Sequence, residues 1–413
     1  MKKKLLSLAL LSAAWLAGGS AQAWDKPAQV DGVYQIGTAS ELEWFSEFVA
    51  GNSNGVTAAV LTADLDFTGV THTPIGPNKN AKFNGSFDGQ YHHIKNLVID
   101  TTDDYQGIFG WVRGGSTIKN FTIDATCSFT GGDRTAAVVA TLNTNAGTDS
   151  PMQILNIVNH ANVNSASGAV SAFIGASDNA VFFKIHNCVN TGNIKTTGNG
   201  KYAVVANGWN SNNPGANSQV WNVVNTGTIS PTDDTNTFFR GKYRSVQNCF
   251  DAVTTVYQSG VSAISAEDIA NGRLCYLLNQ GETKGISFKQ TIGVDLYPMP
   301  VADGPLVYEV ADYNCDGTPK GSVTYSNTEG GSRDAHNYDT ATGLCTVCSA
   351  PKVDWMSAEA DGFFYLGTPV QVEWFSAMVR AGYGAMNAKL TADIDYEGVK
   401  DAHMPIGIVL RSF

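Results

Sequence analysis

A four-residue pattern recurs six times in the middle of this chain: an apolar residue, any residue, an asparagine, and a second apolar residue. The asparagines are Asn96, Asn120, Asn156, Asn187, Asn222 and Asn248, and successive copies lie 24 to 36 residues apart. Self-similarity with such a period is typical of solenoids and other repeat architectures. Each copy is a short apolar stretch between Gly, Asn, Thr or Ser residues, which favours a strand over a helix.

Strands repeated in this way predict the coils of a right-handed parallel β-helix, in which each strand pairs with its copies in the neighbouring coils. The asparagine amides of successive coils would then stack, because a buried amide can donate to one neighbour and accept from the other. We therefore expect the six asparagines to be buried and structural.

Small and apolar residues combine upstream of several copies, as in Gly107-Ile108-Phe109-Gly110. This run, continued by Trp111 and by the stretch from Ile118 to Thr122, resembles the GLUG repeat of bacterial surface and secreted proteins, many of them from gut Bacteroidetes. The resemblance covers roughly residues 32 to 310 and recurs after residue 360. It implies a β-helix and is weak evidence for function. GLUG repeats also occur in some immunoglobulin A metallopeptidases, but the zinc-protease motif HExxH is missing here, so that activity is not carried over.

The first residues have the features of a signal peptide, which we place at residues 1–23. Lys2 to Lys4 form a positive region, Leu5 to Ala17 an apolar one, and Ala21 to Ala23 an A-x-A cleavage site. No later segment is long and apolar enough to predict a transmembrane helix. We expect an exported protein that is secreted, on the cell surface or in the periplasm, and that does not span the membrane.

The charge of the chain excludes one class of partner. The net charge is −11, and Lys and Arg are scattered rather than clustered. Nucleic-acid binding is therefore not expected, because it needs a basic patch that faces the phosphates. Charged residues make up only 15% of the chain, against about 25% in ordinary soluble domains, which suits a solenoid with polar but weakly charged faces.

Two helices are predicted to flank the coils. Thr38 and Glu41 form a capping box for a helix that ends near Gly51 and would cover the N-terminal end of the solenoid. The stretch from Ser265 to Gln280 predicts a second helix at the C-terminal end. With these capping elements, the β-helix domain is expected to span residues 24–312.

The last part of the chain repeats the opening of the first solenoid. Glu373 to Ser376 matches Glu43 to Ser46, Leu390 to Asp395 matches Leu61 to Asp66, and Pro405 to Gly407 matches Pro74 to Gly76. We interpret residues 351–413 as a truncated second copy, and the chain as a fragment or the product of a truncated reading frame. Without stacked coils this copy cannot bury its apolar face, so we expect it to be loosely folded or docked on the first solenoid.

Between the two copies, residues 313–350 form a small module that contains Cys315, His336, Cys345 and Cys348. The C-x-x-C pair, with one further cysteine and a histidine, has a composition that binds tetrahedral zinc. The competing interpretation is a disulfide, since the chain is expected to be exported. Both alternatives stay open at this point, and in either case we expect the four residues to converge. No other cofactor is predicted.

Signs of catalysis are sparse. Asp64 and Asp66 lie two apart and so point to one face of a strand, where they would form a calcium site, a catalytic pair or, as we favour, turn hydrogen bonds. β-Helix lyases and glycosidases need paired carboxylates, or calcium with a basic residue, and no glutamate occurs between Glu47 and Glu267. Trp111, Trp209 and Trp221 are candidates for stacking against sugars, although packing between coils explains them as well.

The sequence therefore favours a secreted or cell-surface, non-enzymatic, adhesin-like β-helix scaffold that contacts glycans or host and other extracellular proteins. The alternative is a polysaccharide-degrading lyase or glycosidase on the same fold. A face of Asn, Thr and aromatic residues would favour binding. Three or more carboxylates converging beside Arg or Lys would favour the enzyme.

Overall fold

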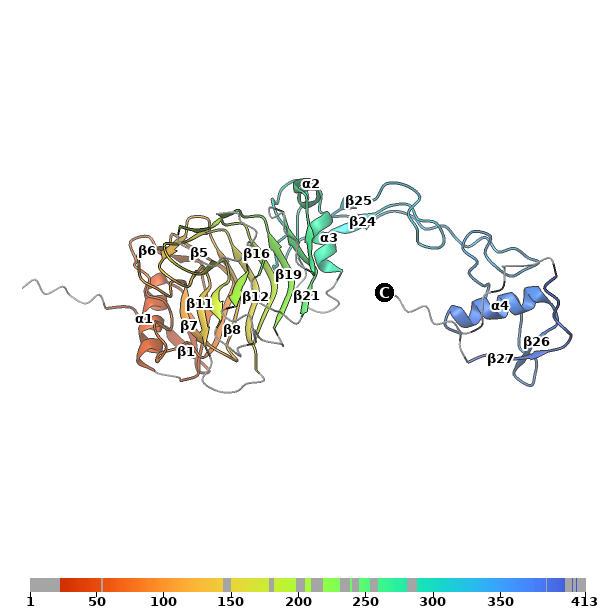
Figure 1. Cartoon of the computed structure of the whole chain (residues 1–413), viewed down its shortest axis with the longest axis horizontal. Coiled ribbons are helices and arrows are strands. Elements are labelled where there is room, and N and C mark those ends of the chain that lie inside the picture. The colour runs from red at the N-terminus through yellow and green to blue at the C-terminus, as the bar shows by residue number, and fades with distance from the viewer. Residues whose placement is uncertain are drawn as a thin grey trace, which may run out of the picture. The chain divides into compact units, whose positions relative to one another are not determined.

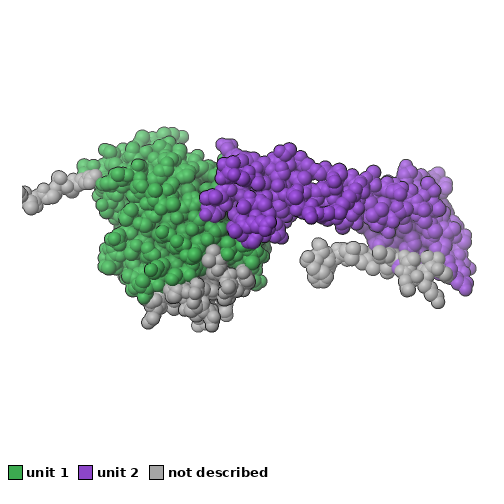
Figure 2. Space-filling view, turned by 90° about the horizontal axis from the view of Figure 1, so that it is seen from above, with its two compact units in different colours: residues 1–264, 299–302 green, residues 265–298, 303–413 purple. Residues whose placement is uncertain are grey.

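The computed structural model describes residues 23–397, 403 and 406, except 53–54, 144–149, 178–181, 198–204, 209–217, 231–237, 240–244, 253–258, 281–287 and 384. Apart from Ala23, the predicted signal peptide lies outside the described residues, and so does Trp209. The chain divides into two compact units, coloured green and purple in Figure 2: unit 1 is residues 1–264 with 299–302, and unit 2 is residues 265–298 with 303–413. In the described residues, no helix has the length and apolarity needed to cross a membrane.

Unit 1 is mainly β and contains a large sheet that runs through it (Figure 1). The strand order is β1-β2-β3-β5-β8-β12-β16-β19-β22-β23, with β4 beside β5 and β21 beside β19. The strands are β1 (Ala28–Val30), β2 (Val33–Ile36), β3 (Thr57–Leu61), β4 (Leu65–Asp66), β5 (Gly85–Lys95), β8 (Thr117–Ile123), β12 (Met152–Asn159), β16 (Phe183–Asn190), β19 (Gln219–Asn225), β21 (Ser245–Gln247), β22 (Cys249–Asp251) and β23 (Val261–Ala263). Only β1 and β2 pair antiparallel, and the other pairings in this sheet are parallel.

Smaller parallel sheets accompany the large one. One contains β6 (Val98–Asp100), β9 (Ser128–Gly131), β13 (Asn162–Ser165), β17 (Ile194–Thr196) and β20 (Ile229–Ser230). Another contains β7 (Phe109–Arg113), β11 (Val139–Asn143), β15 (Ile174–Ser177) and β18 (Ala206–Gly208), and β10 (Thr135–Ala136) pairs with β14 (Val170–Ser171). The chain visits the three larger sheets in rotation, which is consistent with a β-helix or solenoid-like fold.

The core of unit 1 explains the spacing of the sequence pattern. The first residues of four copies, Ile118, Ile154, Ile185 and Val220, are register partners in successive strands, and all have no exposed surface. Burying a side chain of this kind contributes about 1.5 to 3 kcal/mol before the entropy of ordering is counted. One apolar residue per strand at this position therefore builds a continuous column of core residues across the sheet.

The asparagine of the pattern adopts a left-handed backbone conformation in every copy, with φ between 52° and 60°. Asparagine tolerates this region better than most residues. The side-chain amides of five copies form a continuous ladder, in which each Nδ2 donates to the Oδ1 of the preceding coil at 2.8 to 3.1 Å: Asn248 to Asn222, Asn222 to Asn187, Asn187 to Asn156, and Asn156 to Asn120. The Nδ2 of Asn120 donates to Asp88 at 2.9 Å and so ends the ladder.

The sixth asparagine, Asn96, is not part of this ladder, so the prediction of six equivalent positions is wrong at one of them. The prediction that all six are buried is wrong at Asn96, Asn187 and Asn248, which are half-buried because they lie at the solvent-facing side of the turn. The Nδ2 of Asn96 donates to Asp66 Oδ1 at 2.8 Å and to Thr68 Oγ1 at 3.1 Å. The reason is register: Ile94 pairs with Leu65 and Ile123, not with Ile118. The same four-residue pattern therefore occurs at two different corners of the coil.

A second ladder lies three residues after the first and was missed by the sequence analysis. Asn159, Asn190, Asn225 and Asp251 have at most 1% of their surface exposed. The Nδ2 of Asn159 donates to Asn190, that of Asn190 to Asn225, and that of Asn225 to Asp251, at 2.8 to 3.1 Å. The signal that would have revealed it is an asparagine three positions after the pattern's own, as in Asn156 and Asn159.

Unit 1 also contains a helix near its N-terminus, α1 (Ala39–Gly51). The predicted capping box is present, because the Thr38 side chain accepts from the Glu41 N–H and the Glu41 carboxylate accepts from the Thr38 N–H. Leu42, Phe45 and Val49 lie on the buried side of α1 and belong to the core of the unit. The amphipathic pattern of this stretch therefore produces a helix that packs on the first strands.

Unit 2 contains three helices and four strands in its described residues: α2 (Ala266–Ala270), α3 (Arg273–Asn279), β24 (Tyr308–Val310), β25 (Thr324–Ser326), β26 (Phe363–Leu366), α4 (Pro369–Arg380) and β27 (Asn387–Leu390). The helix expected from Ser265 to Gln280 is divided into α2 and α3 by Gly272, whose φ is 91°. Both helices fall in unit 2, whereas the sequence analysis assigned them to the β-helix domain.

The second copy reproduces the local structure of the first. Phe364 pairs with Ala388 and Leu366 with Leu390, as their counterparts Tyr34 and Ile36 pair with Ala59 and Leu61. The helix α4 buries Trp374 completely, and this ring lies 5.9 Å from Trp355 and 5.6 Å from Phe364. The described part of this copy therefore has a small core of its own, which the sequence analysis did not expect.

Candidate functional site

The four residues of the predicted Cys/His module converge in unit 2. Their candidate ligand atoms, the sulfur of Cys315, Cys345 and Cys348 and a ring nitrogen of His336, all lie within 4.8 Å of one another. Cys315 Sγ is 3.6 Å from both of the other sulfurs, and Cys348 Sγ is 3.3 Å from His336 Nδ1. Cys315 and Cys345 are buried, while His336 and Cys348 are half-buried.

Short loops hold these side chains. Cys345 N–H donates to the Ala350 carbonyl and Ser349 N–H donates back to the Cys345 carbonyl, both at 2.9 Å, which closes the turn that contains the C-x-x-C pair. On the other side, the guanidinium of Arg333 donates two hydrogen bonds, at 2.7 and 3.2 Å, to the Cys315 carbonyl. The loops thus fix both cysteine segments through the backbone, so that the sulfur atoms face one another.

Burial and hydrogen bonding set the pKa values of the thiols in opposite directions. Burial, with hydrogen bonds to Cys345 and Cys348, raises the pKa of Cys315 to about 12. At Cys345 burial also raises the pKa, but hydrogen bonds from the backbone N–H groups of Cys348 and Val347, and from His336, outweigh it and lower the pKa to about 6. A turn that directs two N–H groups at one sulfur favours a thiolate, which is the form that binds metals.

The distances fit a metal better than a disulfide. A zinc ion with Zn–S bonds of about 2.3 Å in a tetrahedron separates its sulfur ligands by about 3.8 Å. The observed sulfur separations of 3.6 Å are close to that value. A disulfide needs a sulfur separation of about 2.05 Å, and the three cysteines are free thiols in this structure. Three sulfurs and one imidazole nitrogen form a common donor set for structural zinc.

A second candidate site is one face of the large sheet, here called the outer face. It is formed by the residues that alternate with the buried ones along each strand. It has two rows of register partners: Ser86, Thr117, Gln153, Lys184, Gln219 and Ser245, and then Asp88, Lys119, Leu155, His186, Trp221 and Gln247. Ten of these twelve residues are half-buried, and Ser86 and Gln247 are exposed. Asp88 is the single carboxylate in the two rows, and it forms an ion pair with Lys119 at 3.0 Å.

An aromatic pair stands in the middle of the outer face. The rings of His186 and Trp221 stack at 4.7 Å with an interplanar angle of 7°. Burial and the charge of Lys184 lower the pKa of His186 to about 4, so the imidazole is neutral at pH 7. The Trp221 indole N–H donates to Ser245 Oγ at 2.9 Å, which fixes the orientation of the ring. Trp221 was predicted from the sequence as a candidate, whereas its partner His186 was not.

Of the other tryptophans named from the sequence, Trp111 contributes no such surface. Trp111 is only 8% exposed, and its ring packs 4.7 Å from that of Tyr105. Trp209 lies outside the described residues. The packing interpretation therefore holds for Trp111, whereas Trp221 is accessible at the surface of the sheet.

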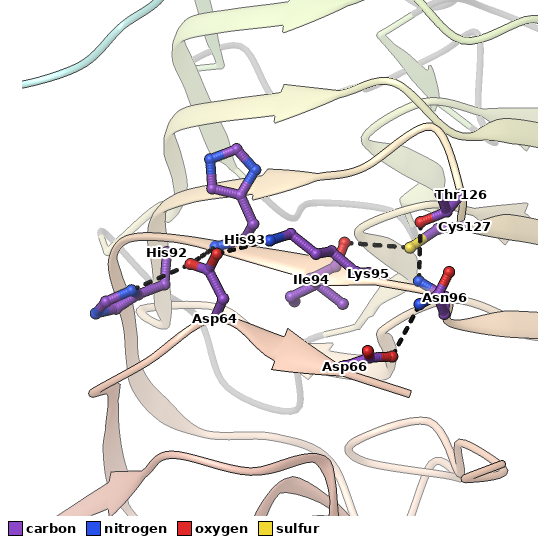
Figure 3. A network of polar contacts seen from close by, with 9 residues as sticks. All are labelled: Asp64, Asp66, His92, His93, Ile94, Lys95, Asn96, Thr126 and Cys127. Carbon is purple, nitrogen blue, oxygen red and sulfur yellow. Dashed lines mark hydrogen bonds and ion pairs between the residues drawn. The ribbon is translucent and has the colours of Figure 1, made fainter. Parts of the chain in front are cut away.

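Asp64 and Asp66, the predicted pair, belong to a polar network at the start of the stack (Figure 3). Asp64 accepts from the His93 N–H at 2.9 Å and from Lys95 Nζ at 2.8 Å, and it lies 3.3 Å from His92 Nδ1. Burial raises the pKa of Asp64, but the contacts with these three residues outweigh it and lower the pKa to about 2.

Asp66 is held by different partners. Its Oδ1 accepts from Asn96 Nδ2 and from the N–H and hydroxyl of Thr68, at 2.7 to 2.9 Å. These hydrogen bonds lower the pKa of Asp66 to about 2, and the one from Asn96 has the largest effect. The two aspartates therefore hold a turn and the next strand in place, as the turn-bonding interpretation predicts.

Comparisons with known proteins give little beyond this geometry. No family model matches the chain, and no curated protein matches it. Among solved structures, the chain is similar to one described as a "putative immunoglobulin A1 protease" from Bacteroides ovatus, with 15% sequence identity and a TM-score of 0.42. The match covers 67% of this chain and 95% of that one. A similarity at this level says nothing about the activity of the present chain.

Proposed function

We propose that this chain is an exported, non-enzymatic binding scaffold, in which the parallel sheets of unit 1 form a right-handed β-helix and the outer face contacts glycans. The observation that carries the proposal is the composition of the outer face. It consists mainly of amide, hydroxyl and aromatic side chains, and its one carboxylate is paired with Lys119. Export is inferred from residues 1–23, and the type of protein from the GLUG resemblance.

The chemistry of the outer face suits carbohydrate. Sugar hydroxyl groups pair with amides and hydroxyls such as those of Gln153, Gln219 and Thr117, while the apolar side of a sugar ring packs on an aromatic face. The rings of His186 and Trp221 stack face to face in the middle of these polar groups, so the apolar surface that the pair can offer a sugar is the outer face of either ring. Because His186 is neutral at pH 7, this surface does not require a charged ligand.

The enzymatic alternative would need another kind of site. The Asp64 and Asp66 network places carboxylates near Lys95, which is the arrangement that would favour a lyase or glycosidase. A general acid must hold its proton near the working pH, however, and both aspartates have pKa values of about 2. Their oxygens are also engaged by neighbouring donors, so we do not place a catalytic pair there.

A glycan-binding screen on the chain from residue 24 onward tests the proposal. We expect binding that Trp221→Ala weakens about tenfold, since ring stacking is worth about 0.5 to 1.5 kcal/mol beyond the area buried. The matched control is Trp44→Ala, because Trp44 is a half-buried, stacked tryptophan on α1. Product analysis is run on each glycan. Absence of glycan binding, equal effects of the two variants, or cleavage products would each contradict the proposal.

For the Cys/His module we propose a structural zinc held by Cys315, His336, Cys345 and Cys348. Metal analysis of protein purified without chelator should find about one zinc per chain, lost in Cys348→Ser. Cys275→Ser is the matched control, because Cys275 is a buried cysteine of the same unit outside the cluster. No bound metal together with two missing thiols would support the disulfide instead. No metal and fully reactive thiols would exclude both.

A further inference from the structure

The second copy in unit 2 contains an open apolar pocket of about 420 Å³. Its lining includes Leu366, Val372, Phe375, Leu390, Ile394 and Tyr396. Leu390 is 66% exposed, and Ile406, which also lines the pocket, is 49% exposed. Apolar residues grouped around one opening are a common feature of interaction sites.

The equivalent residues of the first copy are buried. The counterparts of the six lining residues, in the same order, are Ile36, Leu42, Phe45, Leu61, Leu65 and Phe67. All six have at most 1% of their surface exposed. In unit 2, Leu366, Val372 and Phe375 are buried as well, so the open part of the pocket is formed by Leu390, Ile394 and Tyr396, whose counterparts lie inside the core of unit 1.

In unit 1 the cover is the strand β5 with the residues just before it. β5 pairs in parallel with β3, and Phe87 is the register partner of Ala59. The ring of Phe83 packs against that of Phe45 with centroids 6.4 Å apart. Gly85, between the two aromatic residues, has φ of 149°, and a Cβ there would lie 1.7 Å from the Thr57 carbonyl oxygen. The covering segment thus needs Phe, Gly and Phe at alternate positions.

We propose that unit 2 binds an extended segment of a partner protein that has this same chemistry, with Phe, Gly and Phe at positions i, i+2 and i+4. The segment would add a strand to β27, which pairs only with β26 in the described part of unit 2, and would insert its two rings into the pocket. Main-chain hydrogen bonds to the strand edge would supply affinity, and the pocket would supply specificity.

Unit 1 also sets the register of this added strand. Lys389 on β27 is the counterpart of Val60, and Val60 is the register partner of Asp88 in unit 1. The residue after the second phenylalanine of the segment would therefore lie opposite Lys389, whose Nζ already forms an ion pair with Asp361 at 2.8 Å. The segment is not β5 of a second copy of this chain, because Phe83 and Phe87 have no exposed surface in unit 1. The inference is independent of glycan binding on the outer face.

A fluorescein-labelled peptide with the sequence of residues 81–95 serves as the probe, and its anisotropy is measured against the chain from residue 24 onward. We expect saturable binding by the unmodified peptide, weakened about tenfold or more by Phe87→Ser or Gly85→Val in the peptide. In the protein, Leu390→Asp should weaken binding to a similar degree. Val294→Asp should leave it unchanged, because Val294 is a 75% exposed apolar residue of the same unit outside the pocket.

The folded state of each variant is checked by hydrogen exchange in α4, which should match that of the unmodified chain. Peptide that does not bind saturably would overturn the proposal, and so would equal binding by the Leu390→Asp and Val294→Asp variants. A stable dimer of the unmodified chain that is lost in Leu390→Asp and excludes the peptide would also overturn it, because the occupant would then be a second copy.

Discussion

The first and second copies of the opening segment share local structure and differ in what covers them. In both, a strand leads into a capped helix and then into a parallel strand, with the same register between the two strands. Leu61 of the first copy is 1% exposed, whereas its counterpart Leu390 is 66% exposed. The repeated sequence is thus sufficient for the strand-helix-strand unit, and in the first copy β5 and the residues just before it bury the apolar face of that unit.

A Glu-His pair shows the same contrast. Glu43 and His72 lie 2.5 Å apart with almost no exposed surface, and His72 Nε2 donates to the Ile108 carbonyl at 3.0 Å. Glu373 and His403 repeat the pair at 2.5 Å, but the His403 side chain is 44% exposed. The Glu-His contact therefore forms from the local repeat, while its burial depends on later strands.

Removal of the carboxylate from each Glu-His pair should give the largest difference in stability loss between the two copies. Glu43→Gln leaves the buried His72 without its charged partner and weakens the acceptor of the Thr73 N–H, so unit 1 should lose about 3 to 5 kcal/mol. Glu373→Gln should cost less than about 1 kcal/mol, since solvent reaches its pair. Hydrogen exchange in α1 and α4 under increasing urea measures both. Equal losses would show that burial is not what distinguishes the pairs.

Truncation of the matched leucines is expected to have the next largest effect. Leu61→Ala creates a cavity in the core and should destabilise unit 1 by about 2 to 5 kcal/mol. Leu390→Ala should stay within about 0.5 kcal/mol, because the side chain is largely in water. Urea unfolding, followed by hydrogen exchange in β3 and β27, compares the two. A large loss from Leu390→Ala would mean that the pocket is already filled.

Variants of the asparagine ladder measure how much the stacked amides add to the stability of unit 1. Asn187→Leu interrupts the amide chain and should cost about 1 to 3 kcal/mol in thermal unfolding of unit 1, with a similar loss for Asn222→Leu. Asn387→Leu is the control, because Asn387 is exposed on β27 in unit 2. Wild-type stability in both ladder variants would refute a structural role for the ladder.

The smallest expected difference concerns Asp64 and its counterpart Asp393. The pKa of Asp64 is about 2, below the ordinary 3.8, so the folded state binds this proton less readily than the unfolded state. Its stabilisation is present above pH 4 and is lost as the pH falls toward 2.

Asp64→Asn should therefore cost less than about 1 kcal/mol at pH 7, because the carboxylate is partly exposed, and nothing at pH 2. Asp393→Asn should have no effect at either pH, since the partners of Asp64 all lie on β5. Chemical denaturation at the two pH values makes the comparison. A cost for Asp64→Asn that persists at pH 2 would contradict the role given to its charge.

Local sequence patterns were sufficient to predict much of the fold and the convergence of the four Cys and His residues. Apolar spacing predicted the buried column at Ile118 and Ile154, and C-x-x-C spacing predicted the cluster at Cys345. What the sequence did not reveal depends on register between distant strands. The separate position of Asn96 and the stacked partner of Trp221 both arise from such pairings.

The two asparagine ladders of unit 1 run in opposite directions. In the first, each amide donates toward the N-terminal coils until Asp88 accepts, and in the second each donates toward the C-terminal coils until Asp251 accepts. The aligned amide dipoles of one ladder therefore oppose those of the other, so the stack gains little net polarity along its axis. Because an ionised carboxylate accepts and cannot donate, an aspartate also ends each ladder, and the number of coils in each ladder is encoded by where asparagine gives way to aspartate.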